Sequence, residues 1–438
     1  MSLRPVCGRR GIPLSSTIRL RRDPTGLAES LRAEFGDIAL TSALGHDIVV
    51  AQGPEAAWQL VRDPDRAFAN APVYGFALGG LFERGILLMD HAEHHAHRRI
   101  MQEAFTRENL SKYQRTMQPI IVSAVDRLPV DDDVDMRVWL KALALDISLQ
   151  IFVGTALTQD QADRINRSFV ELIEAASALV RLPVPGLRWR RGHTAKQVVD
   201  DFFGDLLPTR RSDPGPDLMS ALCSARSPDG QLLTDREVID HMRFMLFAAH
   251  DTATIAMTSM AYQLGRHPEW QQRVRDEAMA LPEHPDHSDL ADMASMDLVM
   301  REALRLRPPV PVIPRAALRD TSLCGYHIPE GTFVISLIGA NHRRSDVWSE
   351  PDQFDPERFC PDRAEDRSHR MAWMPFGGGA HKCIGMHFAR VEAFTVLHDM
   401  VRRFSWTVGD DDMEGRDAGL TDNAGFVATV TRLDRRMT

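Results

Sequence analysis

The stretch from Phe376 to Gly385 has the residue types and spacing to keep a deprotonated sulfur in a dry site. It reads FGGGAHKCIG and satisfies the spacing F-x-x-G-x-H-x-C-x-G. Its glycines allow positive φ angles and close backbone approach, so amide groups can fold around the sulfur of Cys383. A helix entered directly after Cys383 would point N–H groups and its positive dipole end at the sulfur, favouring thiolate over thiol. A lone cysteine is usually inert, but five matched positions in ten residues favour a functional thiolate.

A second set of residues, AAHDT from Ala248 to Thr252, could move protons. It lies in a 22-residue stretch between Arg243 and Arg266 in which only Asp251 and one histidine are strongly polar. An acid followed by an alcohol, on a helix opened locally by small residues, can deliver protons through water. The stretch is long enough to cross a bilayer. However, Asp251 near the bilayer centre would cost at least about 2.5 kcal/mol, so we expect a core helix with Asp251 facing a wet cavity.

Two further motifs carry charges that could pair. Glu302 and Arg305 are three residues apart, and Arg358 lies in the segment DPERF. On a helix, side chains three apart share a face, but an exposed pair contributes only about 0.2–0.5 kcal/mol. Taken alone, the pair would therefore be a solvated surface feature.

Four histidines fall within seven residues of the stretch DHAEHHAHRRIMQEAF. Their spacing matches no closed zinc pattern, and no nearby cysteine or carboxylate set completes one. His94 and Arg98 are four apart and therefore share one helical face. Such a pair could bind carboxylates in a site of low dielectric constant, where charge-assisted hydrogen bonds offset desolvation.

Together these motifs resemble those of the cytochrome P450 superfamily, and the resemblance extends along most of the chain. It implies a mainly α, helix-rich fold with small β-sheets, in which haem lies between a distal helix, called I in the family, and a proximal helix, called L. Cys383 would be the axial ligand of the iron in haem b, and its thiolate would donate electron density that promotes O–O cleavage.

The resemblance also implies roles for the other motif residues. Phe376 would pack over the sulfur, while propionate contacts would come from the side chains of His94, Arg98, Arg315 and His381. Glu302, Arg305 and Arg358 would form a buried structural network that holds the cysteine loop. Ala248 begins the distal helix signature, Asp251 would relay protons from solvent, and Thr252 would orient oxygen and water. The second small residue of that signature is Ala249 rather than the commoner glycine, which narrows the groove mildly.

Apolar residues in three segments match family regions that line the distal pocket or its entrance. These segments are Tyr74–Leu88, Leu182–Gly186 and Val310–Ile313, and core packing is an equal alternative for each residue. The lining would favour a hydrophobic small molecule such as a lipid, steroid, terpenoid or polyketide. The candidate pocket residues are Phe76, Leu81, Phe82, Val310 and Val312.

The predicted reaction takes oxygen from O2 and electrons from a separate protein. Only about fifty residues follow the cysteine loop, too few for a fused flavin or iron–sulfur domain. By resemblance, an acidic ferredoxin or flavodoxin-type donor could be steered to basic residues near the cysteine. These residues are Arg99, Arg107, Lys112, Arg115 and Lys382, and a merely solvated surface is the alternative.

Composition sets the wider limits. The chain has 438 residues, 44% of them hydrophobic and 26% charged, which is typical of a globular protein with a large core. A net charge of −9 argues against a general nucleic-acid or anionic-membrane binder, so any electropositive partner site must be local. The five cysteines, without a CxxC pair, indicate a reducing compartment, and we expect a cytoplasmic protein without a transmembrane segment.

The elements that must position these residues are mostly helices. Apolar spacing is helical over residues 93–125 and 140–153, and a hairpin over residues 38–50 precedes a helix that starts at Pro54. Short β-like runs occur at residues 323–328, 333–338 and 426–430. Residues 1–22 carry six arginines and no acid. We expect a mobile segment over residues 1–22, with a transit peptide as the alternative, and a single haem domain over residues 23–438.

Three classes of function fit these motifs. An oxygen-dependent monooxygenase is favoured because Asp251 and Thr252 supply a proton relay, and the reaction would be hydroxylation or epoxidation. A peroxide-dependent peroxygenase or an isomerase on the same scaffold usually departs from the acid–alcohol pair. A non-catalytic haem or ligand-binding protein could keep Cys383 without needing Thr252.

Overall fold

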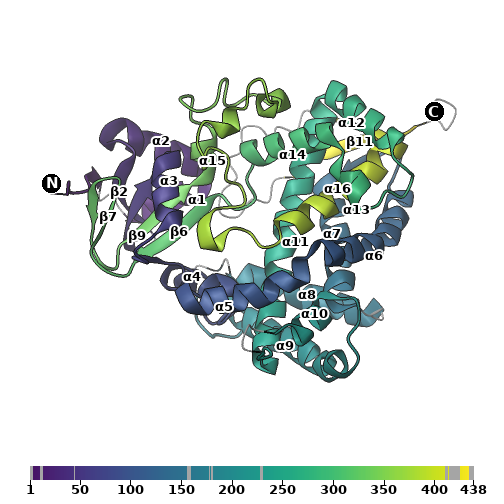
Figure 1. Cartoon of the computed structure of the whole chain (residues 1–438), viewed down its shortest axis with the longest axis horizontal. Helices are drawn as coiled ribbons and strands as arrows, with labels where there is room; N and C mark the ends of the chain where they lie inside the picture. Colours follow the sequence, from purple (N-terminus) through teal and green to yellow (C-terminus); the bar gives the residue numbers. More distant parts are fainter. Residues whose placement is uncertain are drawn as a thin grey trace.

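A computed structural model gives the structure of the chain and describes residues 3–9, 13–43, 45–154, 159–176, 178, 181–226, 230–409, 413 and 425–433. A β-rich part lies on the left of Figure 1, and a larger helical part fills the centre and right. The same view shows α11 (Asp235–Arg266) running through the middle of the molecule.

The largest sheet has six strands in the order β1-β2-β3-β9-β6-β4. Its centre pairs β2 with β3 antiparallel and β3 with β9 parallel. Because side chains alternate across a strand, neighbouring residues of β2 and β3 contribute to two different apolar clusters, one on each face. The strands are β1 (Gly8–Arg9), β2 (Ile38–Ala43), β3 (His46–Ala51), β4 (Phe68–Ala69), β6 (Val312–Ala317) and β9 (Phe333–Leu337).

The chain also forms two smaller sheets, and four helices belong to the same part of the molecule as the large sheet. Strands β5 (Asp133–Asp135), β10 (Phe404–Val408) and β11 (Val427–Arg432) form one small sheet, and β7 (Thr321–Leu323) and β8 (Tyr326–Ile328) form the other. The helices are α1 (Pro13–Arg22), α2 (Pro24–Phe35), α3 (Pro54–Arg62) and α15 (Ile338–His342). The predicted hairpin and the helix starting at Pro54 correspond to β2, β3 and α3.

Helix α11 is long because its start is capped and almost every face of it is buried. The Thr234 hydroxyl accepts a hydrogen bond from the Glu237 N–H, and the Glu237 carboxylate accepts one from the Thr234 N–H at 2.8 Å. This reciprocal capping box satisfies two amides that a helix start otherwise leaves unpaired. The apolar stretch predicted to form a core helix lies in this element. Among the described residues, no helix is long and apolar enough to cross a membrane.

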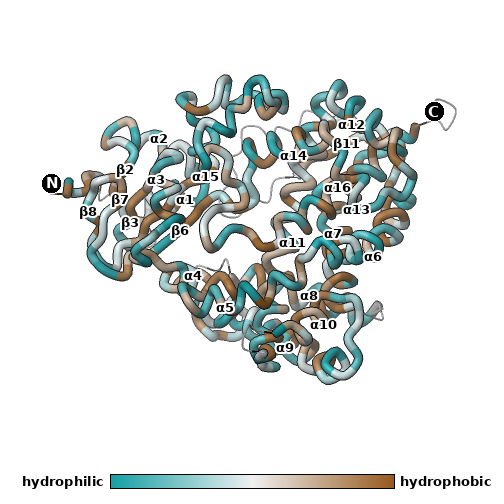
Figure 2. The backbone as a smooth tube through the Cα atoms, viewed as in Figure 1, coloured by the Kyte–Doolittle hydropathy of each residue, from teal (hydrophilic) through white to brown (hydrophobic). Residues whose placement is uncertain are grey.

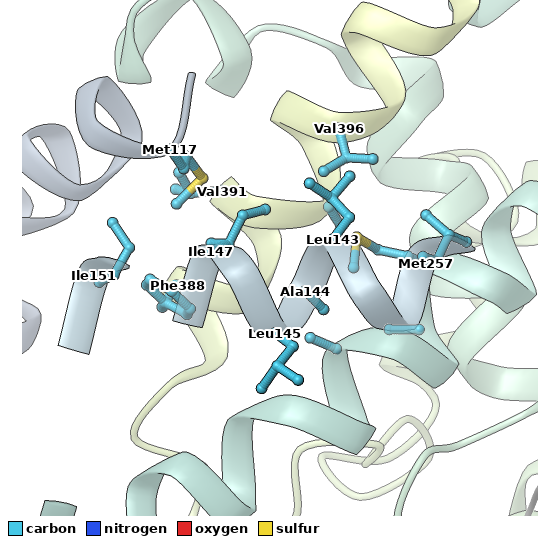
Figure 3. Close-up of a cluster of buried hydrophobic side chains, with 14 of the residues drawn as sticks. Met117, Leu143, Ala144, Leu145, Ile147, Ile151, Met257, Phe388, Val391 and Val396 are labelled. Carbon is cyan, nitrogen blue, oxygen red and sulfur yellow. The ribbon is translucent and has the colours of Figure 1, made fainter. Parts of the chain in front are cut away.

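The remaining helices pack around α11 and share one hydrophobic core. Figure 3 shows part of it, where Leu143 and Ile147 of α7 (Met136–Val153) lie among side chains of α6 (Arg107–Asp126), α11 and α16 (Met386–Arg403). The other helices of the described chain are α4 (Ala71–Leu78), α5 (His91–Gln102), α8 (Gln159–Ala176), α9 (Arg188–Ser212), α10 (Leu218–Ser224), α12 (Pro268–Ala280), α13 (His287–Ala291) and α14 (Ala294–Leu306). Figure 2 shows apolar stretches where helices cross and hydrophilic ones along the outer loops.

The N-terminal segment contains secondary structure where the chain is described. Helix α1 covers residues 13–22, and its Leu20 is 4% exposed within an apolar cluster with α2. The mobile segment over residues 1–22 stays a prediction.

Candidate functional site

The conformation of the cysteine loop is fixed by backbone hydrogen bonds and by a position that accepts only glycine. The Cys383 N–H donates to the Phe376 carbonyl at 2.9 Å, which closes the loop. Gly379 has φ +64°, and a Cβ atom there would lie 2.1 Å from the carbonyl oxygen of Val61 in α3. A side chain at this position would therefore collide with rigid backbone, so the loop's path depends on Gly379.

The surroundings of Cys383 affect the charge of its sulfur. The residue is exposed, yet burial by surrounding protein atoms raises the pKa of its thiol. The Gly385 N–H, which donates to the sulfur, and the cations Arg98 and Lys382 oppose this effect. Helix α16 begins at Met386, so the N–H that reaches the sulfur belongs to the residue just before the helix. Bonding to a metal would overcome the raised pKa, because a coordinated thiol is deprotonated outright.

Four basic residues predicted to bind propionates converge beside this loop. The rings of His94 and His381 lie 3.8 Å apart between centroids. His381 Nε2 is 3.6 Å from Asp90 Oδ1. Arg98 and Arg315 are both close enough to His381 to lower its pKa, and Arg98 also acts on the Cys383 thiol. The structure therefore brings together residues from α5, β6 and the cysteine loop.

The charge in this cluster is unbalanced. Burial lowers the pKa of His94 to about 3, and the nearby His381 and Arg98 contribute to the shift. Burial also lowers the pKa values of Arg98 and Arg315. Asp90 is the only carboxylate that the described residues place in an ion pair with one of the four. A ligand with two carboxylates, as in haem, fits this donor set because it would supply the missing negative charge.

Sequence reasoning missed the residues that complete the cluster. Asp90 accepts backbone hydrogen bonds from Asn70 at 2.7 Å and Ala71 at 2.8 Å, which fix its carboxylate. Burial raises the pKa of Tyr74, whose hydroxyl lies near Arg315. Neither side-chain polar atom of the buried Asn70 has a partner in the described chain. Asp90 is the residue just before α5, but its carboxylate does not cap this helix.

The middle of α11 presents the predicted acid and alcohol. Ala248 is exposed although most residues of the helix are buried. The Thr252 hydroxyl donates to the Ala248 carbonyl at 2.6 Å. Asp251 Oδ1 lies 3.1 Å from Lys141 Nζ of α7, an ion pair whose angles do not make a hydrogen bond. Lys141 is a further residue that the sequence did not signal.

His250 is the unusual neighbour of this pair. It is completely buried, and neither ring nitrogen has a hydrogen-bond partner in the described chain. Its Nε2 lies 3.9 Å from Asp251 Oδ1, and the ring of Phe169 from α8 packs edge-on at 5.7 Å. Burial lowers the pKa of His250 to about 4, although Asp251 opposes the shift. The imidazole is therefore neutral near pH 7.

Glu302, Arg305 and Arg358 form one network without any exposed surface. Arg305 donates to both carboxylate oxygens of Glu302, at 2.6 and 2.9 Å, and Arg358 Nε donates to Glu302 Oε1 at 3.0 Å. Arg305 also donates to the carbonyl groups of Pro351 and Gln353. Arg358 also pairs with the Glu365 carboxylate at 2.9 Å. Each arginine therefore has a carboxylate partner, as a buried ion network requires.

His342 connects this network to the segment before the cysteine loop. The Met374 N–H donates to His342 Nε2 at 2.9 Å, and His342 Nδ1 lies 3.1 Å from the Arg305 carbonyl. An accepting Nε2 leaves the proton on Nδ1, which donates to that carbonyl. Burial lowers the pKa of His342 to about 3, so the ring is neutral and its tautomer is fixed. The sequence did not signal this link.

The candidate pocket residues do not form one lining. Leu81 and Phe82 have no exposed surface, and Phe82 packs 4.5 Å from the Phe247 ring of α11. Phe76 is 44% exposed and packs edge-on against His46 of β3 at 5.0 Å. Val310 is 43% exposed, whereas Val312 packs against the apolar cluster beside α2. The structure thus separates them into buried and surface residues.

The basic and histidine-rich stretches can also be placed. Arg99, Arg107, Arg115 and Lys382 are exposed, and Lys112 pairs with Glu108 at 2.7 Å. His97 turns away from His94 and lies 2.9 Å from His241 of α11, nitrogen to nitrogen. No group of three potential metal ligands from histidine, cysteine, aspartate or glutamate occurs within the described ranges.

Comparison with known proteins agrees with this geometry. The profile of the cytochrome P450 family matches residues 14–428. The chain is 39% identical over 428 residues to cytochrome P450 136 of Mycobacterium tuberculosis, which covers 94% of this chain and 85% of that protein. It is 30% identical over 407 residues to pentalenene oxygenase of Streptomyces avermitilis, covering 90% and 89% of the two chains. A solved cyanobacterial relative with bound retinoic acid has a TM-score of 0.86 at 25% identity, covering 99% and 100%. The predicted mainly α fold is thereby confirmed.

Proposed function

Because this chain belongs to the cytochrome P450 family of haem-thiolate monooxygenases, we propose that it inserts one atom of O2 into a hydrophobic organic substrate by hydroxylation or epoxidation. The observation that carries the proposal is the pair Asp251 and Thr252, present on an otherwise buried helix beside the exposed Ala248. A protein that only held haem or a ligand would have no use for an acid and an alcohol at this place.

Haem b is the proposed cofactor, and Cys383 would hold its iron. His94, Arg98, Arg315 and His381 would hold its two propionates, and Asn70 and Tyr74 stand beside them. When bound, the haem would supply the redox chemistry that activates O2. The Gly385 N–H, donating to the sulfur, would stabilise the negative charge of the thiolate.

Protons for this reduction would be handled by the chain's own residues. Asp251 is one-third exposed and can exchange a proton with solvent, while Lys141 holds its carboxylate on the α7 side. The Thr252 hydroxyl, which now donates to the Ala248 carbonyl, has two lone pairs free to accept from water. An acid that reaches solvent and an alcohol one residue on thus provide a short relay through water.

A largely hydrocarbon substrate is the proposed class, such as a lipid, steroid, terpenoid or polyketide. Phe247, which precedes Ala248 in α11 and is half-buried, packs against the buried rings of Phe82 and Phe244. The names of two similar proteins refer to pentalenene and retinoic acid, both mainly hydrocarbon. Electrons would come from a separate ferredoxin or flavodoxin-type protein. A cytoplasmic location stays a prediction from the cysteine pattern.

Isotope labelling tests the reaction. Haem-loaded protein, NADPH, a ferredoxin and its reductase would be incubated with a panel of terpenoids, steroids and fatty acids under ¹⁸O2. We expect one ¹⁸O atom per product molecule and no product when O2 is withheld. Product that forms with hydrogen peroxide but not with O2 and electrons would instead assign a peroxygenase. Tight ligand binding without any product under either condition would assign a binding protein.

A further inference from the structure

Arg181 carries a positive charge with which no carboxylate of the described chain forms an ion pair. It lies in sequence between α8 and α9, two helices that Figure 1 shows with α4 in the lower part of the molecule. Its Nε donates to the Ala178 carbonyl at 3.4 Å, and its terminal nitrogens donate to the carbonyl groups of Phe76 and Ala77 in α4, the latter at 2.6 Å. A guanidinium has five N–H groups, so these three neutral acceptors leave two of them free.

The environment of this guanidinium differs from that of the arginines that follow it. Arg181 is half-buried, and burial lowers its pKa. Arg188 and Arg191 at the start of α9 are exposed, and they lie 4.0 and 3.8 Å from the Glu174 carboxylate. Arg181 is therefore a partly desolvated cation whose charge is not compensated, an arrangement that costs free energy until an anion binds.

Two aromatic rings hold the Arg181 side chain in place. Its guanidinium carbon lies 5.7 Å from the centre of the Phe76 ring in α4 and 5.2 Å from that of the Trp189 ring in α9. Cation–π contacts at such distances are favourable, and together with the carbonyl hydrogen bonds they fix the guanidinium before any ligand arrives. A group fixed in this way loses less entropy on binding an anion than a free surface arginine does.

A row of apolar residues leads from this guanidinium to the middle of α11. The buried Trp189 ring packs on Gly80, where a Cβ atom would lie 3.2 Å from the ring. Phe82, two residues further on, has its ring centre 4.5 Å from that of the half-buried Phe247. Phe247 precedes Ala248, the exposed position on the helix that carries the acid and the alcohol. Apolar contacts thus connect the charge with the position at which we expect oxidation.

We propose that Arg181 binds the carboxylate of a substrate whose hydrocarbon part extends along these residues toward Ala248. This inference rests on the proposed function and narrows its substrate class to hydrocarbon carboxylic acids. A carboxylate accepts two N–H groups of a guanidinium in parallel, and its negative charge would compensate the cation that the chain leaves unpaired. An alcohol of the same carbon skeleton would make the apolar contacts but leave that charge uncompensated.

Spectral titration of the haem-loaded full chain tests the proposal without turnover. Ligands that enter the pocket shift the Soret band, so each titration gives a Kd. The probes are hexadecanoic acid, abietic acid and cholanic acid, each compared with the alcohol of the same carbon skeleton. We expect at least one acid to bind about ten-fold more tightly than its alcohol, the effect of a charge-assisted hydrogen bond to a partly exposed guanidinium.

Variants of Arg181 separate recognition of the carboxylate from a structural role. Arg181→Gln should reduce the acid-to-alcohol preference to less than about two-fold, because the charge is lost. Arg181→Lys keeps the charge but not the planar fork, so it should retain an intermediate preference. Arg188→Gln is the matched control, since it removes a nearby charge that lies beside Glu174, and it should leave the preference unchanged.

The proposal is overturned if no acid binds more tightly than its alcohol, or if Arg181→Gln weakens both ligands by the same factor. The second result would make Arg181 only a structural connection to α4. Labelled product under ¹⁸O2 without any acid preference would sink this inference alone and leave the monooxygenase intact. Acid preference that depends on Arg181, without labelled product, would instead refute the reaction and leave the carboxylate site.

Discussion

The network behind the cysteine loop and the middle of α11 treat buried polar groups in opposite ways. Around Glu302, each carboxylate oxygen accepts hydrogen bonds from arginines that are themselves fully buried. His342 extends this order to the loop, with both ring nitrogens engaged. On α11, His250 is equally buried, yet both of its ring nitrogens lack partners in the described chain, and Asp251 has a charge pair without an aligned hydrogen bond.

This difference corresponds to two roles: the network fixes the structure of the site, and the α11 residues take part in proton transfer. A fully satisfied buried network is rigid, because any rearrangement leaves charges unpaired in a medium of low dielectric constant. Unsatisfied groups retain the capacity to bind water or exchange protons, and proteins tolerate them where function needs them. The predictions below test this contrast.

The largest effect should come from breaking the network. Arg358→Ala leaves the Glu302 carboxylate with one fewer cation in a site without solvent. We expect a loss of about 3–5 kcal/mol in the free energy of unfolding, measured by urea denaturation, together with lower haem occupancy. Arg273→Ala is the control, since its ion pair with Glu357 is exposed and should contribute less than about 1 kcal/mol. Equal effects of the two variants would refute a structural role for the network.

Two histidine variants compare the regions directly. His342→Leu leaves the Met374 N–H and the Arg305 carbonyl without partners, so it should destabilise the protein by about 1–3 kcal/mol. His250→Leu removes a ring to which the described residues offer no hydrogen-bond partner, so at pH 7.5 the unfolding free energy should change little. The contrast fails if His250→Leu is the more destabilising of the two.

The pH dependence of stability is a further test of the buried, neutral His250. The pKa of His250 is about 4 in the folded chain and about 6.5 when unfolded. Between these values the unfolded chain binds a proton that the folded chain does not. The free energy of unfolding of the wild type should therefore decrease as the pH is lowered, by up to about 1.4 kcal/mol per pH unit from this residue. His250→Leu should lack that loss, and unfolding curves from pH 7.5 to 5 would reveal it. Parallel pH curves for the two proteins would contradict the buried, neutral assignment.

An intermediate effect is expected for the alcohol of the relay. Thr252→Ala should keep oxygen consumption but lower product per NADPH about ten-fold, because protons reach the oxygen less selectively. Hydrogen peroxide release, measured in parallel, should rise to account for the missing product. Thr252→Ser keeps a hydroxyl and is the matched control. Unchanged coupling in the alanine variant would remove Thr252 from the mechanism.

The smallest effect should come from Lys141. Lys141→Met removes the cation that holds Asp251. The free energy of unfolding should decrease by less than about 1 kcal/mol, because the pair is one-third exposed. We expect a change of about three-fold in coupling, equal to about 0.6 kcal/mol, and an altered solvent isotope effect on turnover. Lys141→Arg should restore both. An isotope effect identical in all three proteins would show that Lys141 only adds stability.

Sequence reasoning could recognise motifs whose residues lie close together in the chain. Cys383 and its glycines lie within ten residues, and the apolar stretch around Asp251 predicted the core helix that α11 provides. It missed Lys141 and His342 because their contacts join residues that are far apart in the chain, and no spacing rule covers such contacts. It also could not sort Leu81 from Phe76, since an apolar side chain looks the same in sequence whether it is fully buried or 44% exposed.

The central claim is that Cys383, as a thiolate, holds the haem iron. The most direct measurement is the difference spectrum of the reduced protein with and without carbon monoxide, for the wild type, Cys383→Ser and Cys360→Ser. We predict the strongly red-shifted Soret band of thiolate-bound haem in the wild type and in Cys360→Ser, and its loss in Cys383→Ser. A Cys383→Ser spectrum identical to that of the wild type would contradict the account.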